Sequence, residues 1–320
     1  DGAVNRVFFE IISACRALQG PIEISFLGPE ATFSHQAALD YFGRSAGFLP
    51  QESISDVFKE VEENRADFGI VPVENSTGGV IGLTLDHLIE TDLKVCGEVH
   101  QRISQALMSL EEDCGRIKRV ISHPQALIQC RGWLARNLPA AKLVETPSTA
   151  AAAIRATKTP ASAMVGSEML ADLHGLRVLA REIQDRPFNL TRFLILGRLE
   201  SPRTGRDKTS VLFATPHRPG ALCRCLKPLA EFEVNLTHIE SRPSGQKPWE
   251  YVFFIDFEGH LADDPVRAAL EGLAGGVDKL KILGSYPRGQ IAGPEISQND
   301  SEEKLTGGRS QRAAVYGNRG

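Results

Sequence analysis

The chain has 320 residues, 42% of them hydrophobic and 24% charged, which is the composition of an ordinary globular protein of roughly two domains. Its 36 basic and 40 acidic residues leave a net charge of −4, which argues against a nucleic-acid-binding surface. No stretch approaches the ~18–20 consecutive apolar residues of a membrane-spanning helix. We therefore expect neither nucleic acid nor a membrane as a partner.

The first predicted element is a helix over residues 6–18. Apolar side chains at Val7, Ile11, Ala14 and Leu18 follow the spacing of one helix face, and Gly20-Pro21 ends the pattern. A single helix of this length is marginal by itself. We expect its packing partners to be missing from the chain or supplied by the neighbouring domain.

From Ile22 to about Arg198, short apolar runs alternate with helical stretches, which indicates an α/β domain. Such segments usually form mostly parallel sheets that bind ligands at the carboxyl ends of the strands. The predicted strands are 22–27, 68–73, 93–100, 119–122, 142–145, 163–165 and 193–196. The predicted helices are 34–42, 53–64, 80–90, 126–137 and 150–156.

The remaining chain divides into a linker, a small domain and a tail. Residues 199–209 are polar, contain Pro and Gly and show no periodicity, as in a linker. A βαββαβ pattern follows, which is typical of a ferredoxin-like unit. Its predicted strands are 210–215, 236–240, 251–257 and 280–283, and its predicted helices are 220–232 and 265–273. Residues 289–320 have few large apolar side chains, so we expect a disordered tail.

Six cysteines are spread along the chain: Cys15, Cys96, Cys114, Cys130, Cys223 and Cys225. A secreted disulfide scaffold is shorter and denser in cysteine. We therefore expect reduced thiols in a cytoplasmic protein. The histidine spacing matches no common metal motif, and the chain lacks the usual nucleotide-binding and serine-hydrolase motifs. No metal site is expected.

Three expected strand-to-helix junctions offer hydroxyls and free backbone N–H groups where a helix begins. They are residues 28–34 with Thr32 and Ser34, residues 74–79 with Glu74, Asn75 and Ser76, and the pair Ser148 and Thr149. A helix N-terminus favours an anion. Serine and threonine are also common helix caps, so one such junction proves little. Three on one scaffold favour a ligand with several carboxylates.

A fourth candidate element is Asn189–Phe193, which precedes the apolar run 194–196. The Arg192 guanidinium can donate two hydrogen bonds to one carboxylate. Thr191 can be a simple strand former. If it lies beside Arg192 in a cleft, its hydroxyl can instead donate a proton to a leaving oxygen.

Taken together, these segments resemble a known family. GPEATFSHQAA, GIVPVENSTGG, SHPQALIQC, ETPSTAAAA and NLTRFLILGR resemble, in order and spacing, the motifs of prephenate dehydratase. HRPGAL (217–222), NLTHIESRP (235–243) and KPWEYVFFIDFEGH (247–260) are similar to the segments of its ACT regulatory domain that bind L-phenylalanine. RVFFEIISACRALQ resembles the last helix of the chorismate mutase domain of bifunctional bacterial enzymes.

The resemblance implies a fold and a domain organisation. The catalytic domain is expected to be an α/β, two-lobed, periplasmic-binding-protein-like domain (type II) over residues 21–199. Residues 21–98 with 182–199 form one lobe and 99–181 the other. Residues 1–20 are then a remnant of the chorismate mutase domain, 200–208 a linker, 209–288 the α+β ferredoxin-like ACT domain, and 289–320 the tail.

The resemblance also implies a reaction, in which a hydro-lyase converts prephenate to phenylpyruvate, CO₂ and water without a cofactor. Aromatisation drives this reaction, so the protein need only hold two carboxylates and help the ring hydroxyl leave. The catalytic motif is expected at Thr191, Arg192 and Phe193, with Thr191 as the acid. The substrate-binding residues are expected to be Thr32, Ser34, Glu74, Asn75, Ser76, Ser148, Thr149 and Asn189.

Feedback inhibition by L-phenylalanine is a further implication, in a homo-oligomer that is either a dimer or a tetramer. Free N–H groups at Gly220, Ala221 and Leu222 are expected to hold the ligand carboxylate. Asn235 and a turn at Glu240, Ser241, Arg242 and Pro243 are expected to close the other side of the site.

One residue departs from the family pattern. Ala31 stands where the family usually has glycine, and it would be strained by about 1 kcal/mol or more if its φ angle is positive.

Two alternative functions remain open. The chain could be a non-catalytic sensor of carboxylates or amino acids, which would not need Thr191. The second alternative is residual chorismate mutase activity. A mutase active site is formed by a bundle of helices, and a single helix of that bundle argues against this activity.

Overall fold

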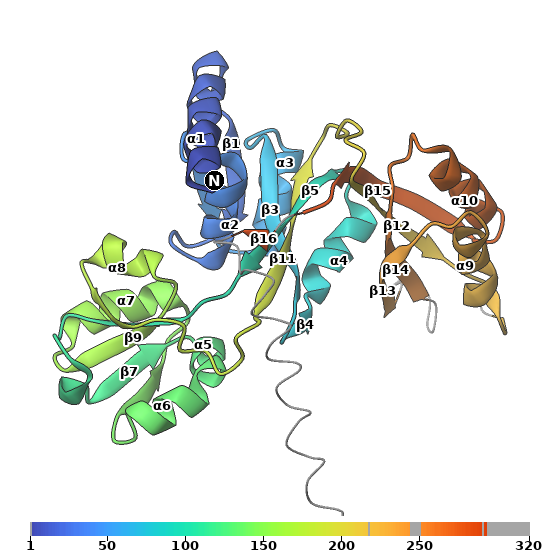
Figure 1. The fold of residues 1–320 in the computed structure, drawn as a ribbon. Helices are drawn as coiled ribbons and strands as arrows, with labels where there is room; N and C mark the ends of the chain where they lie inside the picture. The colour runs from blue at the N-terminus through green and yellow to red at the C-terminus, as the bar shows by residue number, and fades with distance from the viewer. Residues whose placement is uncertain (1, 217, 244–250, 290, 293–320) are drawn as a thin grey trace, which may run out of the picture.

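The computed structural model describes residues 2–216, 218–243, 251–289 and 291–292, which form two lobes and a third, C-terminal domain (Figure 1). Each of the three parts is built on its own β-sheet. The sheet of the first lobe is mixed and seven-stranded, with the order β16-β5-β11-β3-β1-β2 and β4 beside β3.

The strands of the first lobe are β1 (Glu23–Leu27), β2 (Gly47–Gln51), β3 (Phe68–Asn75), β4 (Gly79–Val80), β5 (Lys94–Arg102), β11 (Leu190–Gly197) and β16 (Ile291–Ala292). Its helices are α1 (Gly2–Gln19), α2 (Phe33–Phe42), α3 (Ile54–Glu62) and α4 (Gly82–Glu90). The predicted strands missed β2, which contains Pro50 and lies at the edge of the sheet. An edge position tolerates a residue that lacks a backbone N–H.

The second lobe has a five-stranded sheet with the order β10-β6-β9-β7-β8. Its strands are β6 (Ala106–Ser109), β7 (Arg119–Ser122), β8 (Lys142–Glu145), β9 (Ser162–Gly166) and β10 (Arg177–Ala180). Its helices are a short 3₁₀ turn η1 (Cys114–Arg116), α5 (Pro124–Gln129), α6 (Arg131–Asn137), α7 (Thr149–Lys158) and α8 (Met169–His174). The single helix predicted over 126–137 is therefore two helices that meet at Cys130.

The chain crosses between the lobes twice. It leaves the first lobe after β5, which continues to Arg102, so the expected lobe boundary at 98/99 falls inside a strand. It returns through residues 181–189 into β11. The two crossings lie against each other, because the Ile103 N–H donates to the Asn189 carbonyl and the Ile183 N–H donates to the Gln105 carbonyl.

Because the chain re-enters from the far lobe, β11 runs antiparallel to both of its neighbours, β3 and β5. The sheet is therefore not the mostly parallel one that the α/β pattern predicts. The start of β11 lies beside the carboxyl end of β3, where Thr191 is opposite Asn75. This reversal brings a strand start to the edge of the sheet where parallel strands end.

The third domain is a four-stranded antiparallel sheet with the order β13-β14-β12-β15. Its elements are β12 (Asp207–Ala214), α9 (Ala221–Glu231), β13 (Leu236–Pro243), β14 (Tyr251–Glu258), α10 (Asp264–Ala274) and β15 (Lys279–Pro287). Helices α9 and α10 pack on one face, around Val211, Ile255 and Leu273. β12 begins two residues before the expected domain start and so takes up the end of the expected linker.

The other face of this sheet packs on the first lobe. Leu212, Phe254 and Leu283 of the third domain share one hydrophobic core with Phe58 of α3 and Leu88 of α4. The third domain is therefore docked on the first lobe and is not a loosely tethered module (Figure 1).

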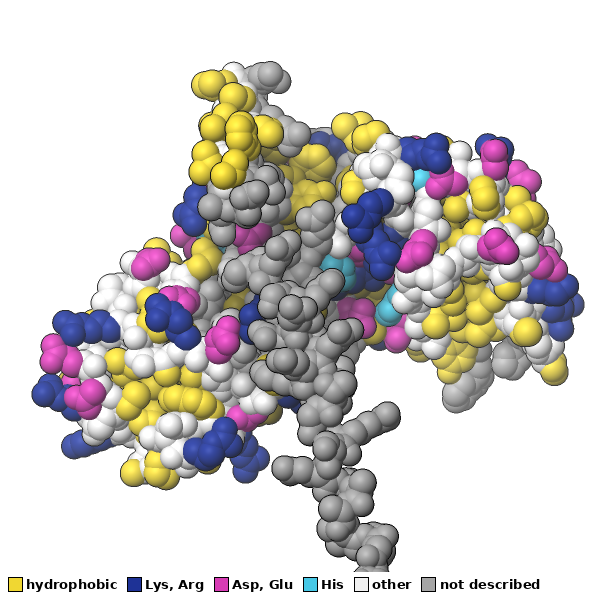
Figure 2. Space-filling model, viewed as in Figure 1, with side chains coloured by type: hydrophobic (Ala, Val, Ile, Leu, Met, Phe, Trp, Pro, Cys, Tyr) yellow, Lys and Arg dark blue, Asp and Glu magenta, His cyan; other side chains and the backbone are white. Residues whose placement is uncertain are grey.

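The two chain ends differ from the rest of the structure. α1 extends from the first lobe and exposes apolar side chains, which gather at the top of the view in Figure 2: Val4, Val7, Phe8, Ile11, Ile12 and Leu18. At the other end, β16 adds a short parallel strand beside His100 and Gln101 of β5, within the tail predicted to be disordered. Residues 293–320 of that tail lie outside the described residues.

Two further expectations can be compared with the structure. All six cysteines are free, with Cys96, Cys130 and Cys225 buried. Burial raises the pKa of the Cys96 thiol to about 11 and that of Cys130 to about 12, which keeps both thiols protonated. Among the described residues, no helix is long and apolar enough to cross a lipid bilayer.

Candidate active site

A cavity of about 450 Å³ is lined by residues of both lobes and contains most of the predicted substrate-binding positions. The first lobe contributes Thr32, Ser34, Asn75 and Thr191 to the lining, and the second lobe contributes Ser148 and Thr149. Residues that lie far apart in the chain therefore meet at one site.

Thr191 is the most closely held of these residues. Its Oγ1 accepts a hydrogen bond from Nδ2 of Asn75 at 2.9 Å, and the same amide donates to Oδ1 of Asn189 at 2.8 Å. Oδ1 of Asn75 accepts from the backbone N–H groups of Thr77 and Gly78. Because those partners can only donate, the Asn75 amide nitrogen must face Thr191.

The first junction is a helix N-terminus, as expected. Oγ1 of Thr32 caps α2 by accepting from the His35 N–H at 3.3 Å, which leaves the N–H groups of Phe33 and Ser34 without intrahelical partners. Ser34 is 7% exposed, and its hydroxyl makes no hydrogen bond within the described part of the chain. These donors are available to a ligand.

Ala31 does adopt the positive φ angle that glycine would favour, with φ of 60°. Its N–H donates to Nδ1 of His35 at 3.0 Å, and the His35 ring stacks on Phe26 with centroids 4.7 Å apart. Burial lowers the pKa of His35, which favours the neutral ring whose Nδ1 can accept this bond. His35 therefore holds the Ala31 loop that leads to Thr32.

The second lobe contributes a helix N-terminus of its own. Oγ of Ser148 caps α7 by accepting from the Ala151 N–H at 3.0 Å, so Thr149 occupies the first turn beside the cavity. Thr149 makes no side-chain hydrogen bond within the described residues. The cavity therefore receives helix N-termini from both lobes.

The segment 74–79 differs from the prediction, because it does not lead directly into a helix. Its residues form a turn and then β4, and α4 begins only at Gly82 without a side-chain cap. Ser76 bridges to the start of β11, accepting from the Leu190 N–H at 3.0 Å. The carboxylate of Glu74 lies 3.7 Å from Nδ1 of His238 in the third domain. Asn75 lines the cavity, whereas Glu74 and Ser76 do not.

Arg192 differs most from its expected role. Side chains alternate along a strand, so Arg192 lies on the opposite face of β11 from Thr191. Its guanidinium binds Glu98, Asp256 and Tyr286, and only 8% of the residue is exposed. With its nitrogens engaged there and no place in the cavity lining, Arg192 is not positioned to bind a substrate carboxylate.

The remaining residues of that motif also have structural surroundings. Phe193 is 2% exposed and packs in a core with Phe26 and Ile195, so it does not touch the cavity. Asn189 is buried and contacts Asn75, and it lines a neighbouring cavity of about 420 Å³ together with Thr77 and Gly78.

Four polar residues of the cavity lining were not predicted from the sequence: Gln105, His123, Gln125 and Gln129. His123 caps α5, and its Nδ1 accepts from the Gln125 N–H at 3.3 Å. The signal was present, because Pro124 occupies the first turn and proline is common there. Gln105 lies at the lobe crossing, which no local pattern reveals. Its buried Oε1 has no hydrogen-bond partner among the described residues.

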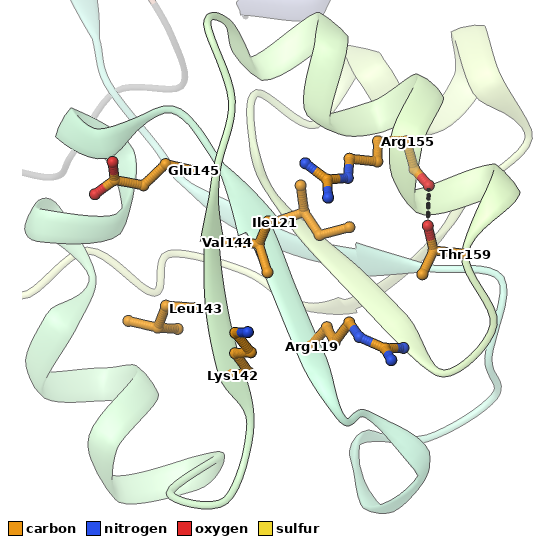
Figure 3. A pocket seen from close by; sticks show the side chains of 8 residues that line it. All are labelled: Arg119, Ile121, Lys142, Leu143, Val144, Glu145, Arg155 and Thr159. Atoms are coloured by element: carbon orange, nitrogen blue, oxygen red, sulfur yellow. Dashed lines mark hydrogen bonds between the residues drawn. The ribbon is translucent and has the colours of Figure 1, made fainter.

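A larger cavity, of about 560 Å³, lies elsewhere in the second lobe beside the edge strand β8. Figure 3 shows Arg119, Lys142 and Arg155 spread around Ile121, and these basic side chains do not converge on one point. Charged residues on an edge strand discourage pairing with another chain. The cavity between the lobes is therefore the candidate active site.

The residues predicted to bind L-phenylalanine lie on two elements of the third domain. Gly220 begins α9 with φ of 73°, followed by Ala221 and Leu222 in its first turn. Asn235 is exposed and lies just before β13. Glu240, Ser241, Arg242 and Pro243 belong to β13 and do not form the predicted turn. Arg242 also pairs with Asp86 of α4, at 2.8 Å, across the domain contact.

Comparisons with known proteins agree on the family. A family model described as prephenate dehydratase matches residues 24–201, and one described as ACT domain matches residues 209–275. A bifunctional chorismate mutase/prephenate dehydratase from Aquifex aeolicus is 46% identical over 286 residues, covering 89% of this chain and 79% of the relative. A prephenate dehydratase from Mycobacterium sp. (strain JLS) is 36% identical over 298 residues, covering 88% and 95%.

A solved structure agrees with the sequence comparisons. The crystal structure of prephenate dehydratase from Arthrobacter aurescens in complex with L-Phe has a TM-score of 0.77 and 33% identity, covering 90% of this chain and 97% of that chain. The expected two-lobed, periplasmic-binding-protein-like domain followed by a ferredoxin-like ACT domain is confirmed.

Proposed function

Because the chain belongs to the prephenate dehydratase family, we propose that Thr191 is the acid of the family's reaction and that the cavity between the lobes binds prephenate. In this reaction the bond to the ring carboxylate breaks and CO₂ leaves. The electron pair aromatises the ring and expels the hydroxyl group, which takes a proton and departs as water.

The contact that carries this proposal is the hydrogen bond from Asn75 to Thr191. It occupies a lone pair of Oγ1 and leaves the hydroxyl proton free to point at the departing oxygen. A neutral threonine is a weak acid in water, so it must act by hydrogen bonding where water is excluded. Thr191 is only 7% exposed, so its side chain has little contact with bulk water.

The two substrate carboxylates are assigned to helix N-termini of the two lobes. In the first lobe, Phe33 and Ser34 line the cavity and offer backbone N–H groups at the start of α2, together with the Ser34 hydroxyl. In the second lobe, the first turn of α7 offers Thr149. Backbone donors at a helix N-terminus stabilise an anion without a basic side chain. This matches a lining that contains no lysine or arginine among the described residues.

The experiment is to incubate the purified protein with prephenate and to measure phenylpyruvate by its absorbance in alkali. Turnover above the rate of the buffer control supports the dehydratase. Binding of prephenate without turnover would instead support the sensor alternative. Chorismate in place of prephenate tests the mutase alternative, and we expect no product from it.

We further propose that L-phenylalanine inhibits the enzyme by binding the ACT domain near Gly220 and β13. The solved relative holds L-Phe, and the first turn of α9 offers backbone N–H groups for a carboxylate.

We also propose a homo-oligomer in which two β13 edges pair, since β13 is an edge strand of its sheet. Light scattering in solution tests the assembly, and a monomer would contradict it. The free thiols support a cytoplasmic location.

A further inference from the structure

We propose that the ACT domain positions Thr191 by binding the side chain of the neighbouring residue, Arg192. Arg192 is then a positioning residue and not a substrate ligand. This inference rests on the role proposed above for Thr191. It concerns a buried polar cluster at the domain contact, formed by Glu98 and Arg192 of the catalytic domain and by Lys208, Ser210, Asp256 and Tyr286 of the ACT domain.

Arg192 is held from three directions. Its Nε donates to Glu98 at 2.6 Å, one terminal nitrogen donates to Asp256 at 2.5 Å, and the other donates to the Tyr286 hydroxyl at 3.1 Å. Two of these three partners belong to the ACT domain. The guanidinium is planar and rigid, so three fixed partners determine its orientation.

The partners of Arg192 are themselves fixed. Asp256 accepts from the Ser210 hydroxyl at 2.5 Å, and the same hydroxyl lies 2.5 Å from that of Tyr286. Glu98 accepts two hydrogen bonds from Lys208, at 2.7 and 2.9 Å. Burial raises the pKa of Glu98, but His100, Arg192 and Lys208 outweigh burial and hold that pKa well below its usual range. Glu98 is therefore ionised.

Each domain contributes one carboxylate and one cation, and the ion pairs Arg192–Asp256 and Lys208–Glu98 form only when the two domains are docked as observed. Two carboxylates, Glu98 and Asp256, face two cations, Arg192 and Lys208, and each of these residues is at most 8% exposed. A buried charge that loses its partner is strongly destabilising. Any shift of β14 or β15 relative to the catalytic domain must therefore move Arg192 as well.

The local backbone explains how a displacement of the Arg192 side chain changes the position of Thr191. The pairing of β11 with β3 shifts register between Arg192 and Phe193, where Val73 is an extra residue on β3. A bulge interrupts the ladder and redirects the side chains beyond it. Thr191 and Arg192 lie beyond this bulge, opposite Asn75 and Glu74, and β5 pairs with both residues without a shift in register. The Arg192 side chain adds a further anchor on the side of this short segment where the β3 ladder is interrupted.

The test is Asp256→Asn, a substitution of similar shape in the ACT domain that keeps an acceptor for Arg192 but removes the charge. We expect kcat for prephenate to fall about tenfold with KM changed less than about twofold, because misplacing a reacting group costs rate more than binding. The matched control is Glu258→Gln. Glu258 is also on β14 and also pairs with an arginine, Arg288, but within the described residues its side chain makes no hydrogen bond or ion pair with β11. The control should keep kcat within about twofold of wild type.

A double substitution separates positioning from general structural support. If Asp256 acts through Thr191, adding Asp256→Asn to Thr191→Ala should lower the remaining rate less than about twofold, because residues that act through one group are not additive. Tyr286→Phe, which removes only one hydroxyl, provides the same comparison if Asp256→Asn does not fold. Thermal unfolding of each variant reports on folding.

The outcomes are distinguishable. An equal loss of kcat in the wild-type and Thr191→Ala backgrounds would overturn the proposal, and so would a folded Asp256→Asn enzyme with wild-type kcat. Failure of the wild-type protein to form phenylpyruvate would instead remove the proposed function itself, before any variant is compared.

Discussion

The side-chain amide of Asn75 donates a hydrogen bond to Oγ1 of Thr191 over 2.9 Å. The orientation of this amide is fixed, because its oxygen accepts from the backbone N–H groups of Thr77 and Gly78. The Thr191 hydroxyl must therefore direct its own proton elsewhere, and the cavity is the open direction. The pair therefore leaves the Thr191 hydroxyl oriented to donate a hydrogen bond into the cavity.

Thr191→Ala should lower kcat for prephenate by roughly 10²-fold or more, within the range for lost acid catalysis, with substrate binding largely intact. Thr191→Ser is the matched control, because it keeps the hydroxyl and should retain most of the activity. Steady-state phenylpyruvate formation measures both. Near-wild-type turnover by the alanine variant would remove Thr191 from the mechanism.

The stability of the loop before α2 should depend on pH through His35. Burial lowers the pKa of this histidine below its ordinary value of 6.5, and protonation of Nδ1 would break the bond from the Ala31 N–H. The unfolded chain then binds more protons than the folded one as the pH falls below 6.5. This stabilisation is fully present above that pH and is lost as the pH falls toward the folded-state pKa.

Urea unfolding of wild type and two variants at pH 7.5 and 5.5 checks this expectation. His35→Asn keeps an acceptor near Nδ1 but does not titrate, so the difference in unfolding free energy between the two pH values should shrink. His35→Leu should be less stable than wild type at pH 7.5, because the Ala31 N–H loses its partner. An unchanged pH difference in both variants would contradict the role of His35.

Ala31 should tolerate glycine but not valine. A left-handed backbone costs an L-residue roughly 1–2 kcal/mol. Glycine would relieve that cost but would lose a buried methyl group, worth about 0.8 kcal/mol, and would gain freedom in the unfolded chain, worth about 0.4–1 kcal/mol. Ala31 is 3% exposed and packs with second-lobe residues such as Met108.

We therefore expect Ala31→Gly to change the free energy of unfolding by less than about 1 kcal/mol. Ala31→Val should cost at least about 2 kcal/mol, because a β-branched residue is an outlier at positive φ and the site is tightly packed. Urea denaturation of both variants measures this, and equal stabilities would show that the backbone there is not strained.

Gly220 can be tested with two substitutions that differ in backbone tolerance. Its φ of 73° favours glycine whatever its function, so Gly220→Val alone would not separate a turn residue from a ligand site. Asparagine tolerates the left-handed region and still places a side chain where the ligand would approach. We expect both variants to raise the L-phenylalanine concentration for half-inhibition at least about tenfold, within the usual range of allosteric coupling.

Their activity without L-phenylalanine should stay close to wild type. Full inhibition of Gly220→Asn would show that Gly220 serves only the turn. If wild type itself does not respond to L-phenylalanine, the ACT domain is an assembly element, and the proposed feedback is wrong.

Local patterns predicted the fold class and most of the elements. The alternation of apolar runs and helical stretches located α2, α3, α7 and the buried strands β1, β3 and β5 to within a few residues, because amphipathic periodicity and capping residues are local properties of the chain. The edge strand β2 was missed, since its half-exposed residues carry a weaker pattern, and so were the edge strand β10 and the buried, four-residue strand β6, whose short run carries little pattern. The family likewise followed from ordered motifs.

The direction of individual side chains was decided by the tertiary structure. Thr191 and Arg192 are adjacent in the sequence, and both were expected to serve the substrate. Once β11 enters the sheet between β3 and β5, alternation sends Thr191 to the cavity and Arg192 to the ACT domain. The sequence by itself determined which residue types gather at the start of β11. Which of them meets substrate depends on long-range strand pairing and on where the third domain docks, and neither is encoded in any local pattern.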